Sequence, residues 1–333
     1  MQKKDLGLAV LILIVGVIVA IINPRFVSAV NLANTANLVG LFGLFSIASA
    51  FVIVTGGIDL SIGSVIALLG VLFVDLVVSA AVPWPLVVLI VLAAGALIGL
   101  AHGWLVTRVG IQPFIVTLCG LLIYRGAARY YTHDGTAGFT FGQSIPSLEA
   151  VIAGRSLGIP HATIAFAVVA LASWFVLHRT VFGRHLFAVG KNASAARYTG
   201  IDAARVTTLA YVICASLTAL SAIFIAMYTR SVQPSSHGSF YELYGIAAAV
   251  LGGFSLRGGE GSVIGVVLGV ILLQVLQNLV NLLGIPSSLN FAVMGSVILA
   301  GVIADIQITR YRQARRARIA LAETAGSPAP ADR

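Results

Sequence analysis

One stretch of the sequence could be mistaken for a nucleotide-binding loop, and it ends in Gly190-Lys191. A phosphate-binding loop needs four residues between its two glycines and a Ser or Thr after the lysine, because backbone N–H groups cradle the phosphates and the hydroxyl ligates Mg²⁺. Here six residues separate Gly183 from Gly190, and Asn192 stands where the hydroxyl is needed. We therefore expect this chain to bind no nucleotide and no other cofactor.

No metal site and no catalytic group is indicated. The cysteines Cys119 and Cys214 lie in apolar stretches without metal-ligand spacing, and no nucleophile, base and oxyanion donors come together in the sequence. Asp75 and His102 are ionisable residues inside apolar segments, where the proton relay of an ion-driven transporter would need them. Polar contacts within the protein are the commoner role for such residues, and no second acidic partner is evident.

A glycine pair, Gly56-Gly57, breaks an apolar stretch. Consecutive glycines free the backbone to leave a helix, and Asp59 or Ser61 can then cap the next helix, because negative charge stabilises a helix N-terminus. Broken helices of this kind often border a transport path. The sequence leaves open whether Asp59 only caps the helix or also acts in gating or solute passage.

A weak internal echo links residues 56–66 with residues 258–264, since both contain a glycine pair followed by Gly-Ser-Val-Ile. Transporters are often built from repeats, and glycine-interrupted segments in corresponding positions point to the transport path. One matched stretch is only suggestive of such a repeat.

Four carboxamide side chains share one face of a later apolar segment at the spacing i, i+3, i+4 and i+7: Gln274, Gln277, Asn278 and Asn281. In membrane proteins such side chains hydrogen-bond neighbouring helices or line a path for a hydroxyl-rich solute. We favour a path or a subunit interface. Neutral donors and acceptors also suit a neutral sugar better than a zwitterionic amino acid.

The composition is that of a membrane protein, since 59% of the 333 residues are hydrophobic and 9% are charged. Apolar runs of about 17–25 residues can cross a hydrocarbon core of about 30 Å. We predict an all-α polytopic integral membrane protein with about ten transmembrane helices, at residues 6–22, 36–54, 62–82, 84–107, 112–128, 162–178, 206–228, 243–254, 262–283 and 288–306. The eighth is short for a span. The first is interpreted as an uncleaved span rather than a signal peptide.

The basic residues predict the orientation of the chain. If the N-terminus is cytoplasmic, 15 of the 20 Lys and Arg residues fall inside and 5 fall outside. The positive-inside rule favours this arrangement, so we predict that both termini are cytoplasmic. The net charge of +9 then reflects topology and lipid headgroups, and no nucleic-acid partner is expected. Two of the outside residues, Arg125 and Arg129, could extend to the membrane surface or meet acidic residues of a binding protein.

The predicted transmembrane domain covers residues 1–310 and contains two long loops. Residues 129–161 are predicted to lie on the periplasmic side, and residues 179–205 on the cytoplasmic side. The basic tail, residues 311–333, has no apolar periodicity and is predicted to be disordered.

The cytoplasmic loop has features of a docking element. Asn192 can cap a short helix, and Gly200 can end it. Ala195 and Ala196 have small side chains, which permit close approach of another protein to that helix. An ordinary solvated loop is the alternative.

Three ordered blocks of the sequence, residues 55–64, 183–201 and 242–262, resemble the permeases of ribose-type ATP-binding-cassette importers. That family also includes xylose, galactose and autoinducer-2 systems. The resemblance implies that the second block is a coupling loop, which docks in a groove of the ATPase subunit. Its matching positions are Gly183, Arg184, Ala188, Gly190, Asn192, Ala195, Ala196 and Gly200. Tyr244 and Phe254 depart from the family pattern, and both bear on substrate identity more than on membership.

The resemblance also implies the partners and the cellular location. We expect a permease homodimer or heterodimer in the lipid bilayer of the bacterial inner membrane. A cytoplasmic ATPase would bind ATP and Mg²⁺, and a periplasmic sugar-binding protein would deliver the solute. This chain would then be no enzyme itself and would translocate a monosaccharide such as ribose or xylose. The alternatives are an ion-gradient-driven secondary transporter and an importer of the same family for a non-sugar solute.

Overall fold

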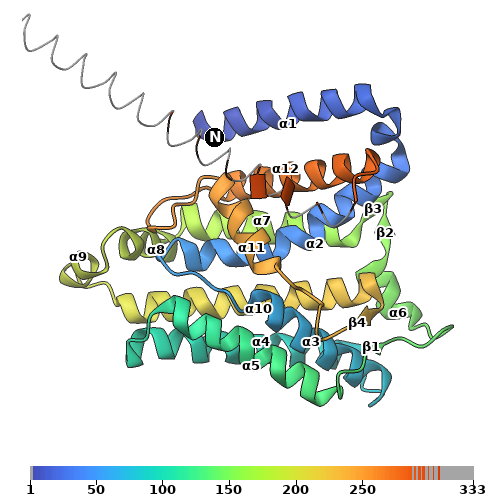
Figure 1. Ribbon diagram of the computed structural model, residues 1–333. Helices are drawn as coiled ribbons and strands as arrows, with labels where there is room; N and C mark the ends of the chain where they lie inside the picture. The colour runs from blue at the N-terminus through green and yellow to red at the C-terminus, as the bar shows by residue number, and fades with distance from the viewer. Residues whose placement is uncertain are drawn as a thin grey trace, which may run out of the picture. The chain divides into compact units, whose positions relative to one another are not determined.

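The computed structural model describes residues 3–286 and eight scattered residues between Leu289 and Gln307. Within residues 3–286 the chain is mainly helical (Figure 1). The α-helices are α1 Lys3–Ile22, α2 Ala29–Ile53, α3 Ile62–Val78, α4 Trp84–Trp104, α5 Pro113–Tyr131, α6 Pro146–Leu148, α7 His161–Arg179, α8 Val181–Lys191, α9 Ala193–Tyr198, α10 Ala203–Thr229, α11 Tyr241–Leu251 and α12 Val263–Leu282. Three shorter helical turns are η1 Pro24–Val27, η2 Leu105–Val109 and η3 Glu149–Ala153.

Four two-residue strands complete the described fold, and they form two antiparallel pairs. The first pair is β1 Ala137–Gly138 with β4 Ser231–Val232, and the second is β2 Arg155–Ser156 with β3 Ile159–Pro160. These strand pairs hold loops together at one end of the helical bundle.

Each of the first nine predicted spans contains a helix, and the prediction of an all-α polytopic membrane protein is confirmed. Among the described residues, six helices are long and apolar enough to cross a membrane: Asp5–Ile22, Ala29–Ile53, Trp84–Val109, His161–Arg179, Ala203–Thr229 and Val263–Leu282. The helices α3 and α11 are apolar but shorter. The tenth predicted span, 288–306, lies mostly outside the described residues, and the tail 311–333 lies wholly outside them.

The eighth predicted span corresponds to a half-length helix. α11 has 11 residues, which at about 1.5 Å per residue reach only ~16 Å, about half of the hydrocarbon core. Such a short helix leaves non-helical backbone within the bundle on at least one side. The chain therefore contains an interrupted segment here as well as at Gly56-Gly57.

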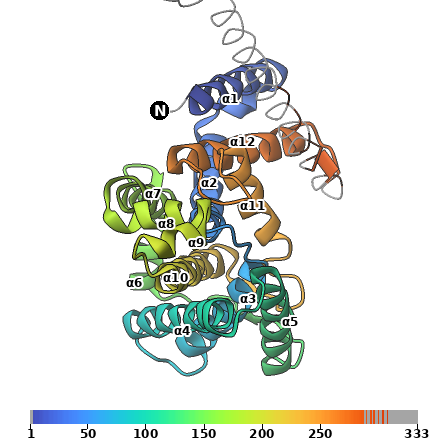
Figure 2. The same ribbon diagram turned by 90° about the vertical axis from the view of Figure 1, so that its left-hand side faces the viewer.

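α10 lies at the centre of the bundle and contacts α2, α3 and α4. Figure 2 views the bundle from the side of α8 and α9, and there α10 lies between α2 and α4. α4 comes close to α10 because Gly95, Gly99 and Gly103 recur every four residues along their contact. A Cβ atom at Gly99 would lie 2.4 Å from the carbonyl oxygen of Tyr211. Small residues allow such close approach between helices in lipid, where van der Waals packing drives association.

The remaining long helices divide into core and lipid-facing elements. In the apolar 18-residue stretch of α2, 78% of the residues are buried. The corresponding share is 22% for both α4 and α7 and 11% for α1. The exposed residues of α1, α4 and α7 include Leu13, Leu97 and Leu171. Acyl chains solvate an apolar surface of this kind, so these helices face the bilayer while α2 and α10 form the core.

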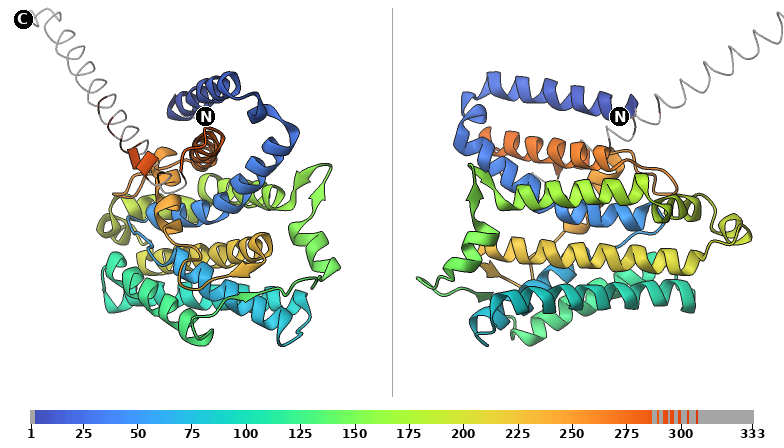
Figure 3. Two further views of the ribbon diagram at one scale, coloured as in Figure 1. Left: turned by 45° about the vertical axis from the view of Figure 1, so that its right-hand side comes forward. Right: turned by 180° about the vertical axis from the view of Figure 1, so that it is seen from behind.

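The bundle has two chemically different ends, which Figures 1 and 3 show on opposite sides. The helices α8 and α9 project from one end, which we call the α8–α9 end. The strand pairs, α6 and η3 lie at the other, which we call the strand end. The charge distribution predicts that the α8–α9 end is cytoplasmic and the strand end periplasmic, and this orientation stays a prediction.

Candidate functional site

The break between α2 and α3 places a buried carboxylate inside the bundle. α2 ends at Ile53, and Gly56 takes a positive φ of 83° before α3 begins at Ile62. In the intervening turn Asp59 is only 4% exposed. One of its oxygens, Oδ1, accepts hydrogen bonds from the Ser61 backbone N–H at 2.8 Å and from the Ser61 hydroxyl at 2.6 Å.

The cap of α3 is therefore organised by Asp59 rather than by the side chain of Ser61. Ser61 occupies the N-cap position, but its side chain accepts no capping hydrogen bond, and its hydroxyl donates to Asp59. Ser64 then donates its hydroxyl to the Ser61 carbonyl at 2.7 Å. Asp59 thus shapes the turn that starts α3, and a further role in gating or solute passage stays a prediction.

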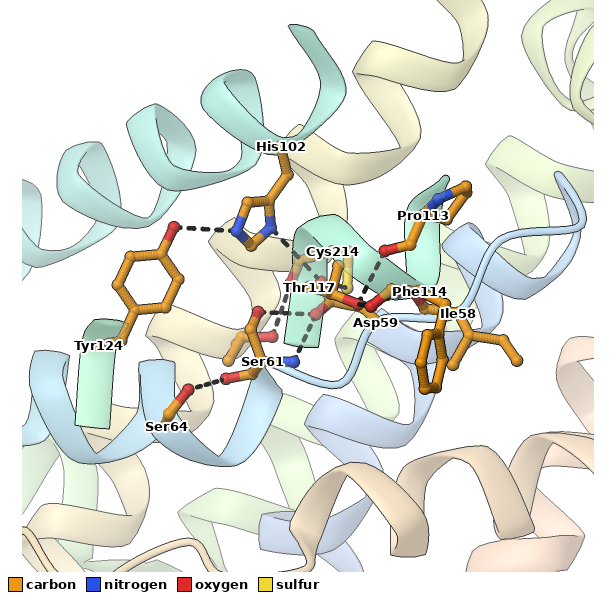
Figure 4. A network of polar contacts seen from close by, with 11 residues as sticks. Ile58, Asp59, Ser61, Ser64, His102, Pro113, Phe114, Thr117, Tyr124 and Cys214 are labelled. Carbon is orange, nitrogen blue, oxygen red and sulfur yellow. Dashed lines mark hydrogen bonds and ion pairs between the residues drawn. The ribbon is translucent and has the colours of Figure 1, made fainter. Parts of the chain in front are cut away.

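The second oxygen of Asp59 faces side chains from two other helices (Figure 4). His102 of α4 places its Nδ1 atom 3.9 Å from Oδ2, and Cys214 of α10 places its Sγ atom 3.8 Å away. The Tyr124 hydroxyl of α5 lies 2.9 Å from Nε2 of His102. Side chains of three helices thus converge on the turn that joins α2 to α3.

This convergence gives His102 polar contacts within the bundle, including an acidic neighbour that the sequence does not reveal. No acidic partner was evident for His102, because Asp59 is 43 positions away in the sequence and the two residues meet only in the folded bundle. Asp75 lies elsewhere, at the far end of α3, where the Tyr131 hydroxyl donates to its Oδ2 atom at 2.5 Å. The two ionisable residues therefore have separate partners.

One buried hydroxyl beside the break has no partner. The Tyr211 hydroxyl of α10 is fully buried and has no hydrogen-bond partner among the described residues. It lies next to the break, since a Cβ atom at Gly57 would be 2.8 Å from it. Gly57 therefore leaves room for the Tyr211 hydroxyl, which would have to shift if this position carried a side chain.

The carboxamide face of α12 mostly makes contacts between helices. Asn278 donates to Oδ1 of Asn31 at 2.9 Å and to Oγ1 of Thr35 at 2.8 Å, both on α2. The Tyr244 hydroxyl of α11 donates to Gln277 at 3.2 Å and accepts from Gln274 at 3.5 Å.

Asn281, the fourth carboxamide, is exposed near the end of α12. The bonds of the other three agree with the alternative of hydrogen-bonding contacts between helices. A role of the carboxamides in the solute path stays a prediction. Tyr244, a departure from the family pattern, joins this hydrogen-bonded group.

The predicted coupling loop folds into two consecutive helices, α8 and α9. Thr180 caps α8 by accepting from the Gly183 N–H at 3.2 Å, and Asn192 caps α9 by accepting from the Ala195 N–H at 2.9 Å. Gly200 follows α9 with a positive φ of 86°. The buried face of α8 packs on α7 and α10, whereas α9 is largely exposed.

The individual residues of this loop divide by exposure. Gly183 and Ala196 are buried, and Ala188 and Gly190 are partly buried. The remaining predicted positions are exposed: Arg184, Asn192, Ala195 and Gly200. Tyr198, which the sequence did not single out, is 93% exposed at the end of α9.

The three sequence blocks meet at the α8–α9 end. The Gly259 N–H donates to the Val54 carbonyl at 2.8 Å, so the turn before α12 is bonded to the end of α2. A Cβ atom at Gly190 would lie 1.8 Å from the same carbonyl oxygen. The two glycine-rich stretches that echo each other in sequence therefore pack together, with the end of α8 against both.

Arginine side chains hold the loops of the strand end. Arg125 of α5 donates through Nη1 to the Pro234 carbonyl at 2.7 Å and to the His237 carbonyl at 2.6 Å. Arg230 pairs with Glu149 at 2.7 Å, and this hydrogen bond holds the pKa of Glu149 below its usual value. Arg125 thus bonds within the chain, a role that the sequence did not indicate.

The comparisons with known proteins agree with this architecture. A family model described as the permease component of a branched-chain amino acid transport system matches residues 31–302. The ribose import permease protein of Escherichia coli strain K12 is 36% identical over 305 residues, covering 92% of this chain and 94% of the relative. The corresponding protein of Bacillus subtilis strain 168 is 38% identical over 305 residues, covering 92% and 93%.

A further relative is named for a different solute. The autoinducer 2 import system permease protein of Yersinia pestis strain Pestoides F is 31% identical over 326 residues, covering 96% of this chain and 97% of the relative. No solved structure matches the chain. The polytopic helical fold and these similarities together define a transport permease of the bacterial inner membrane. The chain belongs to the permeases of ribose-type ATP-binding-cassette importers.

Proposed function

We propose that this chain is the membrane-spanning subunit of an importer that carries a monosaccharide such as ribose or xylose across the inner membrane. A separate cytoplasmic ATPase binds ATP and Mg²⁺ and drives transport, and a periplasmic binding protein delivers the sugar. Two permease chains form the membrane dimer. Several relatives named as ribose import permeases, aligned over more than nine-tenths of the chain, support the substrate class.

The α8–α9 element is the observation that carries the proposed ATPase partnership. It lies at an end of the bundle rather than on its lipid-facing side, so the exposed Tyr198 ring is not covered by acyl chains. Exposed aromatic side chains are frequent anchors of protein interfaces. Arg184 and Arg197 are also exposed on these two helices and are available for polar contacts with a partner.

The proposed mechanism couples this element to the interrupted helices. ATP binding and hydrolysis on the partner displace α8 and α9. The bundle then alternates between outward-open and inward-open states around the break between α2 and α3. Transporters of this kind place solute near discontinuous helices, because unwound backbone and helix N-termini offer polar groups inside the membrane.

Reconstitution of the chain tests the energy source. Proteoliposomes would contain the permease with its ATPase subunit and binding protein, and uptake of labelled ribose and xylose would be measured with and without ATP. We expect uptake only when all components and ATP are present, and inhibition by vanadate. Accumulation driven by an ion gradient in vesicles that hold the permease alone would overturn the proposal.

Substitution of Tyr198 tests the docking surface. We expect Tyr198→Ala to weaken copurification of the ATPase by about tenfold, in line with loss of one anchor of an interface. Tyr130→Ala is the matched control, because Tyr130 is 83% exposed on α5, toward the strand end of the bundle. Equal copurification of the two variants would contradict the proposed docking of α9.

One observation favours a second candidate, the secondary transporter. The buried Asp59–His102 pair, with Tyr124 behind it, has the residue types of a proton relay. Asp59→Asn separates the candidates when uptake by the permease alone, without ATP, is measured over a range of external pH. If uptake depends on the pH gradient in the wild type but not in the variant, proton coupling is favoured. If wild-type uptake does not depend on the pH gradient, proton coupling is excluded.

The solute could also belong to another class within the family. The autoinducer 2 relative has 31% identity, close to the 36% of the ribose relative from Escherichia coli, so identity alone does not separate the two solutes. Competition of labelled ribose uptake by xylose, galactose and autoinducer-2 would rank them. If autoinducer-2 competed far more strongly than the sugars, it would replace the sugar as the proposed solute.

A further inference from the structure

Backbone contacts at glycines join three separate connections at the α8–α9 end. We define the glycine junction as Val54, Gly56, Gly190, Gly258 and Gly259, and we infer that it passes movement of α8 into the α2–α3 break. The inference rests on the proposed function, because α8 and α9 must be moved by a partner. It goes further by assigning which residues receive that movement.

The contact between α8 and the end of α2 leaves no room for a side chain. A Cβ atom at Gly190 would lie 1.8 Å from the Val54 carbonyl oxygen and 2.5 Å from the Gly259 nitrogen. Real Cβ atoms essentially never come within 3.0 Å of a backbone atom. Any residue other than glycine at position 190 therefore pushes α8 away from both neighbours.

The turn before α12 completes the junction in a conformation that favours glycine. Gly258 and Gly259 have positive φ values of 82° and 73°. A Cβ atom at Gly258 would lie 2.7 Å from the Gly56 nitrogen and 2.9 Å from the Gly190 carbonyl oxygen. One turn thus touches both the α2–α3 break and the end of α8, while the Gly259 N–H bonds the Val54 carbonyl.

The junction adds a route that the covalent chain lacks. Thr180 links α8 directly to α7, and residues 199–202 link α9 to α10, so displacement of the coupling loop along the chain reaches only α7 and α10. The junction connects the same loop to α2 and α3, and to the connection between α11 and α12. Because Val54 begins the non-helical stretch that contains Asp59, a shift of α8 reaches the buried carboxylate within five residues.

The contacts at the junction are between backbone atoms, which gives them a mechanical consequence. Packed interfaces of this kind respond as rigid or two-state units rather than by gradual deformation. The glycine junction is therefore a positioning device that keeps α8, the end of α2 and the turn before α12 together during the transport cycle. Loosening it should separate ATP hydrolysis from transport without removing either partner.

The first test is Gly190→Ala in the reconstituted importer, with Gly126→Ala as control. Gly126 is an exposed glycine of α5 with no atom within 4 Å of its added Cβ. The readout is sugar transported per ATP hydrolysed, which a purely structural defect would not change in the molecules that remain folded. We expect a fall of about tenfold for Gly190→Ala and no change for Gly126→Ala. A wild-type ratio in Gly190→Ala overturns the inference.

A chemical cross-link provides a second test, which applies even if the Gly190→Ala permease does not assemble with its partner subunits. Lys191 and Glu260 form an ion pair of 2.8 Å beside the junction, so a carbodiimide can join them by an amide bond with loss of water. The permease is treated with carbodiimide, and the reagent is quenched before the ATPase is added. The Glu260→Gln variant cannot form this cross-link and is treated in the same way, so it receives every other modification that the reagent causes.

We expect the cross-linked wild type to keep the transport ratio of treated Glu260→Gln, because the joined segments move together. Failure of the cross-link to form, or a ratio that falls only in the cross-linked wild type, overturns the inference. Absence of ATP-driven transport by the untreated wild type would instead refute the proposed function, so the two failures are distinguishable.

Discussion

The two ends of the bundle hold their connections by different means, since the strand end adds arginine side chains to its two short strand pairs. At the α8–α9 end the backbone of Gly190 and Gly259 touches other backbone directly, whereas at the strand end Arg125 reaches across to two carbonyls. A backbone contact has no side-chain torsions to absorb displacement, but an arginine has several. The comparison indicates that the α8–α9 end transmits small movements, while the strand-end loop that Arg125 holds can rearrange when that side chain rotates.

The sharpest test of this difference compares two glycines with the same backbone conformation. Gly259 at the α8–α9 end and Gly158 at the strand end have φ values of 73° and 81°. A Cβ atom at Gly259 would lie 2.7 Å from the Lys191 nitrogen, while nothing lies within 4 Å of one at Gly158. Alanine in this conformation costs roughly 1–2 kcal/mol at either site. Overpacking adds about 1–3 kcal/mol at Gly259 alone.

Thermal unfolding of the detergent-solubilised variants measures both costs. We expect Gly259→Ala to lower the unfolding temperature clearly more than Gly158→Ala. The shift in Gly158→Ala measures the cost of the backbone conformation alone. The additional shift in Gly259→Ala is therefore the steric contribution of the glycine junction. Equal shifts would mean that the junction relaxes freely, and the contrast between the two ends would be lost.

A smaller effect is expected from the arginine that spans the strand end. Arg125→Ala removes donors from the Pro234 and His237 carbonyls, and partly buried carbonyls left without a donor cost about 1–3 kcal/mol. Arg129→Ala, one turn further along α5, removes an exposed pair with Asp134 and should lower the stability much less, because solvent screens such a pair. Unfolding of the two variants side by side checks the ranking. A larger loss in Arg129→Ala would show that the strand end is held by its surface pairs.

A weaker and pH-dependent contribution is expected from Glu149. The hydrogen bond from Arg230 lowers the pKa of Glu149 in the folded protein, so this bond adds stability above the usual carboxyl pKa. That stability is lost as the pH falls through the lowered value. Because Arg230 is 41% exposed, the pair is worth less than about 1 kcal/mol.

The check is the pH dependence of unfolding in Glu149→Gln. The variant should be slightly less stable than the wild type near neutral pH and equally stable in acid. Unfolding curves recorded from neutral to acidic pH would show the two converging. Parallel curves over the whole range would assign the loss to packing rather than to the ion pair.

The helices could be predicted from the sequence because their signal is local. Each of the first nine apolar runs contains a helix, since an apolar segment in lipid must satisfy its backbone hydrogen bonds internally. The boundaries were less predictable. α2 begins at Ala29, seven residues before the predicted start at 36, because Ser28 caps it by accepting from the Asn31 N–H.

The contacts between helices could not be predicted, because they join residues far apart in the chain. Asp59 meets His102 across 43 positions, and Gly190 meets Val54 across 136. The sequence carries one usable signal for such contacts, the recurrence of glycine every four residues at Gly95, Gly99 and Gly103. That spacing predicts close helix packing in a membrane, and here it lines the contact of α4 with α10.

The smallest expected effect separates backbone from side chain at the α8–α9 end itself. Lys191 and Glu260 pair directly beside the glycine junction, but they are 69% and 62% exposed. Exposed pairs contribute about 0–1 kcal/mol, so exchanging the two residues, or replacing Lys191 by Met, should leave the unfolding temperature almost unchanged. The same measurement on Gly259→Ala, one residue from this pair, should show a large shift. If removing the ion pair destabilised the protein as much as Gly259→Ala, the α8–α9 end would be held by charge, like the strand end.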